Sequence, residues 1–216
     1  IVLVGVTGFV ILATMLNISS YRDSKEQAVR LYTDKARSVV LAAEASRENM
    51  AKKWKMGIFT KESLRAWSDN GEIDKVVSAV PVVSAWETTM AKADEGGYTF
   101  KVPKFSPRNP DNEPDVLEAE VLRKFEKENI DSYVTFDEDL NSLRYFHPIR
   151  LTQECMLCHG HPDTSEELWG NTDGLDPTGA RMENWAVGEV HGAFEVVQSM
   201  EDVDAIIRTS MLKKIA

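Results

Sequence analysis

The chain has 216 residues, a length that fits one domain or one and a half and excludes a large multidomain enzyme. Its 43% hydrophobic and 28% charged residues are typical of a globular protein and exclude a disordered or collagen-like chain. The formal net charge of −10 argues against nucleic-acid binding, which needs a surplus of Lys and Arg to neutralise phosphates.

Residues 1–20 predict a transmembrane anchor. No charged residue occurs from Ile1 to Tyr21, and the stretch up to Leu16 is almost wholly aliphatic. About 20 apolar residues are needed to span a bilayer, so this run is long enough. A cleaved signal peptide is the alternative, but it requires a shorter apolar core and an A-x-A-like cleavage site, and neither is present. The sequence therefore favours an uncleaved anchor.

Residues 21–58 predict one long juxtamembrane helix. No Pro or Gly occurs between Asn17 and Met56, and the first helix-breaking residue is Gly57. Apolar residues recur every three or four positions, which marks one face of a helix: Val29, Tyr32, Ala36, Val39, Val40, Ala43, Met50 and Trp54. This narrow stripe is consistent with a homodimer formed along the helix. Packing of the stripe on its own domain is the equal alternative.

The rest of the chain predicts further helices and four strands. Helices are expected at residues 60–67 and 81–93, from Pro114 onward, and after Ser199, which is a typical N-cap residue. Strands are expected at residues 98–102, 133–136, 143–149 and 187–198, with a hairpin between the second and third. Helices followed by antiparallel strands indicate an α+β fold.

Both cysteines of the chain lie in Cys155-Met156-Leu157-Cys158-His159. This is C-x-x-C-H, the attachment signature of c-type haem. Two thiols at this spacing can form thioethers to the two vinyl groups of one porphyrin. The histidine directly after them is then held beneath the iron as its proximal ligand. The pattern predicts one covalent haem c.

Three other interpretations of this segment are weaker. A structural zinc site needs four ligands, and the sequence lacks a second cysteine pair. A thioredoxin-type redox pair is expected at the start of a helix in a βαβ unit, whereas this segment follows a predicted hairpin. A disulfide across two intervening residues would be strained.

Four motifs in order resemble the Tll0287-like family of haem-binding, PAS-like periplasmic sensor domains. They are PRNPDNEPD at 107–115, RYFHPI at 144–149, CMLCHG at 155–160 and GEVHGAFEV at 188–196. The resemblance extends over about residues 36–198. It implies a PAS-like antiparallel sheet with flanking helices, which we place at residues 59–199, and the C-terminal helix predicted after Ser199 then occupies 200–216. It also implies that haem c is loaded outside the cytoplasm.

The sixth iron ligand stays open at this point. Some relatives supply a cysteine or a helix methionine, and this chain has no third cysteine. Met50, on the apolar face of the long helix, ranks first, and His191, at the start of the last strand, ranks second. An exchangeable water or an open position is the third alternative. His161 is only two residues from His159, and His147 reads equally well as a surface histidine.

Other residues are expected around the haem. Arg108 and Asn109, in a proline-rich loop, are candidates for anchoring the haem propionates or the backbone, because Arg pairs well with carboxylates. Aromatic residues are expected to line the porphyrin: Trp54, Tyr145, Trp169 and Trp185. No catalytic constellation is present, so no enzyme activity is expected.

These features predict a membrane-anchored, extracytoplasmic haem c sensor domain that responds to redox state or a small gaseous ligand. The alternative is a monohaem c-type cytochrome that transfers electrons, free or as an anchored subunit of a respiratory complex. The expected partners are the membrane, a second copy through the long helix and a redox protein, but no nucleic acid. The expected location is the inner membrane, with the haem domain in the periplasm.

Overall fold

The computed structural model describes residues 2–215, and the side chains of residues 12, 14–207 and 209. The predicted α+β class is confirmed, with a long N-terminal helix and a four-stranded antiparallel sheet. The helices are α1 (Val2–Lys55), α2 (Lys61–Asp69), α3 (Ile73–Ser78), α4 (Pro81–Met90), α5 (Ala93–Gly96), α6 (Val116–Lys127), α7 (Met156–His159), α8 (Ser165–Trp169) and α9 (Glu201–Ile215), with 3-10 turns η1 (Pro110–Asn112), η2 (Gln153–Cys155) and η3 (Pro162–Thr164).

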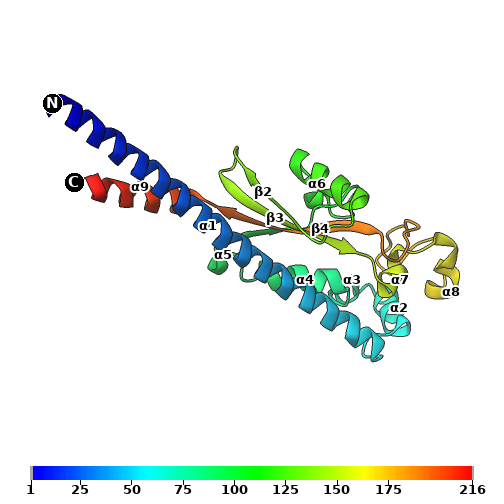
Figure 1. Cartoon of the computed structure of the whole chain (residues 1–216). Coiled ribbons are helices and arrows are strands. Elements are labelled where there is room, and N and C mark those ends of the chain that lie inside the picture. Colours follow the sequence, from blue (N-terminus) through cyan, green and yellow to red (C-terminus); the bar gives the residue numbers. More distant parts are fainter. Residues whose placement is uncertain (1, 216) are drawn as a thin grey trace.

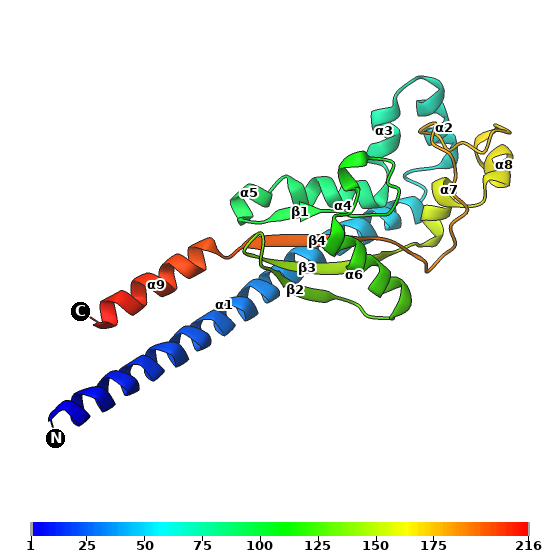
Figure 2. The same cartoon turned by 90° about the horizontal axis from the view of Figure 1, so that it is seen from above.

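The sheet has the order β1-β4-β3-β2, and each of the four predicted strands is found in it. The strands are β1 (Thr99–Lys101), β2 (Tyr133–Asp137), β3 (Ser142–Arg150) and β4 (Val190–Ser199). The central pair, β3 and β4, is antiparallel and runs in register from Ser142 opposite Ser199 to Ile149 opposite Gly192. Figures 1 and 2 show α1 along one face of this sheet and α6 on the other.

The apolar stripe of α1 packs on the chain's own domain. Ala36, Val40 and Ala43 are at most 1% exposed and form one core cluster with residues of α4 and the sheet, among them Phe194 and Val196. Small side chains on this face allow the helix to approach the strands closely. The stripe that suggested a homodimer is therefore already covered within one copy.

The predicted membrane anchor falls largely on residues whose side chains lie outside the described part of the chain, namely 1–11 and 13. Within the described residues, no helix meets the length and hydropathy needed to span a membrane.

The face of the sheet toward α6 carries a buried network of charges. Arg144 on β3, only 2% exposed, donates to Glu195 of β4 at 2.5 Å and to Glu118 of α6 at 3.0 Å. It also donates to Asp115, the N-cap residue of α6, at 2.8 Å and to Asp137 of β2 at 2.9 Å. The guanidinium of Arg144 thus links β3 to β4, β2 and α6, and four carboxyl groups surround it.

Glu195 is the carboxyl group of this network whose negative charge is disfavoured. Burial raises the pKa of Glu195 to about 8, and the neighbouring Glu118 adds to the rise, although Arg144 opposes it. Glu118 already contacts Lys101 of β1 as well as Arg144. Within the described structure, Oε2 of Glu195 is buried without a hydrogen-bond partner. A proton on Glu195 would relieve the repulsion from Glu118.

We expect Glu195→Gln to stabilise the chain at pH 8 and to leave it almost unchanged at pH 4.5. The folded pKa of Glu195 is raised to about 8 from its ordinary value of 4.5, so the folded chain keeps a proton that the unfolded chain has lost. The contribution of protonated Glu195 to the free energy of unfolding is therefore fully present below about pH 4.5 and is lost as the pH rises through 8. Glutamine mimics the protonated form, and the gain should be about 1–3 kcal/mol at high pH.

Urea midpoints of both chains at pH 4.5, 6 and 8 provide the measurement, since the difference between the two chains cancels the other titrating groups. Glu126→Gln is the matched control, because Glu126 is exposed on α6, the helix that also carries Glu118. A stability difference that does not depend on pH would contradict the raised pKa.

A second core cluster lies beyond the end of the sheet, next to the C-terminal end of α1. Trp54 of α1 donates its indole N–H to the carbonyl of Ala79 at 2.8 Å and packs against this cluster. Leu157 and Cys158 also pack against it, together with Trp169 of α8. This cluster fixes the position of the C-x-x-C-H segment.

Candidate functional site

The C-x-x-C-H segment forms a compact helical turn after β3. Cys155 ends η2, and α7 follows directly as Met156–His159. Residues three apart on a helix are neighbours, so this turn presents both cysteines on one side. Gly160 ends α7, and a Cβ atom there would lie 2.5 Å from the carbonyl oxygen of Met156, so only glycine fits this position.

Both thiols are free and half-buried. The backbone N–H of Thr152 donates to Sγ of Cys155 at 3.4 Å, which holds that sulfur at the start of the turn. Cys158 lies against the apolar cluster that contains Trp169, and burial, with the nearby Asp176, raises its pKa well above the usual range. The Cys158 thiol is therefore protonated at neutral pH.

His159 is held by a carboxylate. Its Nδ1 lies 2.8 Å from Oε2 of Glu183. Burial tends to raise the pKa of Glu183, but hydrogen bonds from His159 and Arg108 outweigh it and lower this pKa to about 2. An ionised carboxylate can only accept, so Nδ1 of His159 is the donor, and Nε2 is the nitrogen left for a metal.

The loop after Met182 returns to the C-x-x-C-H turn. The N–H groups of Asn184 and Trp185 donate to the carbonyls of Gly160 and His159, at 3.0 and 2.8 Å respectively. This short backbone pairing places Glu183 on one side of the His159 ring. It places the start of β4 on another side of the same ring.

His191 lies beside His159. The ring centroids are 4.4 Å apart at an interplanar angle of 60°, and the Trp185 ring lies 5.1 Å from His191 on another side. Nε2 of His191 is buried and has no hydrogen-bond partner among the residues that the structure describes. Burial, followed by the charges of His159 and Lys104, lowers the pKa of His191 to about 2. The ring is therefore neutral, which is the form that binds metals.

Gly192 permits this placement of His191. Its ideal Cβ atom would lie 2.8 Å from the carbonyl oxygen of Pro103, too close for any side chain. The N–H of the next residue, Ala193, donates to the same carbonyl at 3.1 Å. Because β4 passes so close to this loop, His191 is held against the C-x-x-C-H turn.

Arg108 connects several parts of the site. Its Nε and Nη2 donate to the two oxygens of Glu183 at 2.8 and 3.0 Å, and its Nη1 donates to the fully buried Asp176 at 2.5 Å. Nη2 also lies 3.1 Å from the carbonyl oxygen of Cys158. The structure thus directs this guanidinium to the chain's own carboxylates and not to an open space for a haem propionate.

The remaining expected site residues lie elsewhere. Asn109 caps η1 by accepting from the N–H of Asp111 at 3.1 Å, which is a structural role. Tyr145 is 5% exposed and belongs to the core cluster under α1. Met50 is buried on α1 at 9% exposure. Glu183 and Asp176 were not predicted, because they lie in an irregular segment with no periodicity or spacing to single them out.

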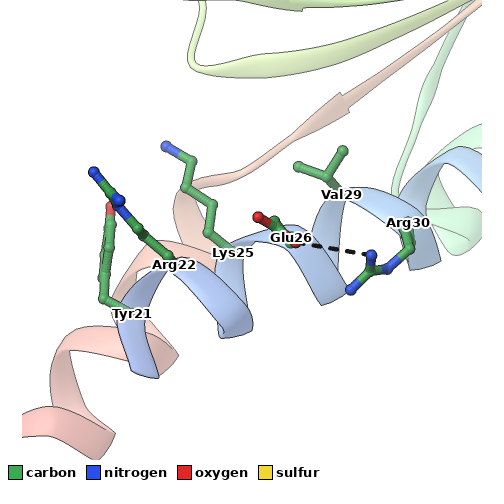
Figure 3. Close-up of a pocket in the computed structure, with 6 residues that line it drawn as sticks. All are labelled: Tyr21, Arg22, Lys25, Glu26, Val29 and Arg30. Carbon is green, nitrogen blue, oxygen red and sulfur yellow. Dashed lines mark ion pairs between the residues drawn. The ribbon is translucent and has the colours of Figure 1, made fainter. Parts of the chain in front are cut away.

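A groove of about 520 Å³ lies at the opposite end of the molecule, on α1 (Figure 3). It is lined by Tyr21, Arg22, Lys25, Glu26, Val29 and Arg30, with Arg30 paired to Glu26 at 3.8 Å. None of these residues is a cysteine or a histidine, so the groove is separate from the C-x-x-C-H site. Among the described side chains, no group of three or more His, Cys, Asp or Glu residues is arranged to hold a metal ion.

The fold and the site define an α+β domain with a half-buried C-x-x-C-H turn and a second histidine beside it. The family model described as Tll0287-like matches residues 25–199, most of the chain, so the protein belongs to the Tll0287-like family. This confirms the family that the four motifs indicated, and the family is not a known enzyme family. The match begins within α1, whose C-terminal half forms part of the core.

One solved structure, described as the cyanobacterial heme-protein Tll0287, is similar to the chain. The identity is 18%, the match covers 53% of this chain and 71% of the other, and the TM-score is 0.39. No curated protein matches the chain.

Proposed function

We propose that this domain binds one haem c, with thioethers to Cys155 and Cys158 and with His159 as an iron ligand. The observation that carries the proposal is the C-x-x-C-H turn, half-buried with both thiols free, which lies against a second, neutral histidine. The solved relative named as a heme-protein is consistent with it. Bound haem would supply an iron that can exchange one electron or take a small ligand.

The residues present fit such a group. Nδ1 of His159 is occupied by Glu183, which leaves Nε2 for iron. Nε2 of His191 is buried without a hydrogen-bond partner among the described residues, a costly state that a metal bond would relieve. We therefore propose His191, ahead of Met50, as the sixth ligand. Its ring lies beside His159 with centroids 4.4 Å apart, so the two rings would separate to admit the iron, whereas Met50 lies on α1.

We further propose that the domain is a PAS-like sensor anchored in the inner membrane, with the haem in the periplasm, and that it responds to redox state. Two imidazole ligands leave no open position for a gas, and this favours redox sensing over gas sensing. The same arrangement supports the second candidate, an electron-transferring monohaem cytochrome with a redox partner protein. A homodimer through α1 would have to use a face of this helix other than the packed stripe. Leu31 and Leu41 are exposed on α1 and could contribute to such a face.

A distance measurement separates the sensor from the electron carrier. Spin labels on Gln27→Cys in α1 and Ala205→Cys in α9, both exposed positions, report the spacing of the two helices near the chain termini. A sensor should change this spacing between the ferric and ferrous states, since its output must leave through these helices. An unchanged distance contradicts the sensor and leaves the carrier. The same labels on a haem-free Cys155→Ser, Cys158→Ser chain serve as the control.

A further inference from the structure

Glu183 is fixed from both sides. Arg108 grips its carboxylate with two hydrogen bonds, Nε to Oε1 at 2.8 Å and Nη2 to Oε2 at 3.0 Å. Such a fork fixes the plane of a carboxylate as well as its position. Asp176, whose side chain is fully buried, holds the other arm of the guanidinium at 2.5 Å.

The held carboxylate points at one atom. Oε2 of Glu183 lies 2.8 Å from Nδ1 of His159, the ring nitrogen that faces away from an iron bound at Nε2. A carboxylate that accepts from the outer N–H of a ligating histidine fixes its tautomer and orientation and makes the coordinating nitrogen more basic. A more basic ligand stabilises the ferric state relative to the ferrous state.

We infer that Glu183 is a positioning residue that sets the reduction potential of the iron through His159, and that Arg108 and Asp176 keep it in place. This inference rests on the proposed haem site. It assigns a role to residues outside the C-x-x-C-H motif. It also explains why the Glu183 carboxylate, paired with Arg108, is directed at the histidine of that motif.

The test is the midpoint potential of the haem-loaded Glu183→Gln protein. Glutamine keeps the size of the side chain but accepts a weaker hydrogen bond from Nδ1. We expect the ratio of reduced to oxidised protein at a fixed potential to rise about tenfold, which is 59 mV for a one-electron couple. The low-spin spectrum should persist. Arg108→Lys, which keeps the charge but loses the fork, should shift the potential in the same direction by less.

Glu189→Gln is the matched control, since Glu189 is exposed in the same segment and accepts from the N–H of Ala186 instead of from a histidine. An equal shift in Glu189→Gln would reduce the effect to general charge and overturn the inference. So would an unchanged potential in Glu183→Gln. If Glu183→Gln does not load haem, Arg108→Lys replaces it as the test, and an unchanged potential in that variant overturns the inference. Loss of haem from the wild type in acid would instead refute the covalent haem attachment on which this inference rests.

Discussion

Replacing both thiols, Cys155→Ser with Cys158→Ser, will give a chain with no haem-associated mass after denaturation in acid. The wild type will keep its haem under the same conditions, because thioether bonds survive denaturation and iron ligands do not. The loss should be complete, since the chain has no other cysteine. Mass spectrometry of the denatured protein, together with its absorption spectra in the oxidised and reduced states, provides the measurement.

Met156→Ala is the matched control for this experiment. Met156 lies between the cysteines on the same turn and is half-buried, so its replacement disturbs the segment but leaves both thiols. It should retain full haem mass. A wild-type chain whose haem is extracted by acid would show that the C-x-x-C-H turn does not attach haem covalently.

The second large effect concerns the far side of the iron. His191→Ala should convert the haem-loaded protein from low-spin to high-spin and should let carbon monoxide bind the ferrous iron directly. The reason is that the neutral His191 ring is the imidazole that lies against His159, with centroids 4.4 Å apart. Met50→Ala should leave the spectrum and the carbon monoxide reaction unchanged.

His161→Ala is the control for the loss of a histidine near the motif. This residue is largely exposed, and its Nδ1 accepts from the N–H of Asp163 at 3.2 Å. If Met50→Ala opens the site and His191→Ala does not, the sixth ligand comes from α1, as the sequence alone favoured. If neither does, the position is held by water or is open.

The sequence predicted the longer helices and the four strands, because each carries a local signal, but it did not predict the short helices α3, α5, α7 and α8. Gly57 ends α1 with a φ of +73°, and Thr60 caps α2 through its hydroxyl, accepting from the N–H of Ser63. Ser199 accepts from the N–H of Glu201 at 3.2 Å at the start of α9. Such signals depend on neighbouring residues, so they can be read without the fold.

The sequence could not provide partners across long separations. The periodicity of α1 predicted a buried face, but it could not distinguish the chain's own sheet from a second copy. Arg108 was expected to pair with a carboxylate, that of a haem propionate. Its partner Glu183 is 75 residues away in the sequence, and no sequence pattern links the two residues. His191 ranked behind Met50 for the same reason. Only the fold shows that β4 begins beside the C-x-x-C-H turn.

The continuity of α1 has a mechanical consequence. The helix is unbroken over 54 residues, so at 1.5 Å per residue it is about 80 Å long. Its C-terminal end, at Trp54, packs in the cluster that also holds Cys158, and α9 runs beside its N-terminal half in Figures 1 and 2. Because helical hydrogen bonds resist stretching, an axial shift at Trp54 would move the helix as a whole, including the face around Ala36 and Val40 that packs on β4. The neighbouring α9, which follows β4 directly, would stay in place, so that the axial shift of α1 would change the relative position of the two helices.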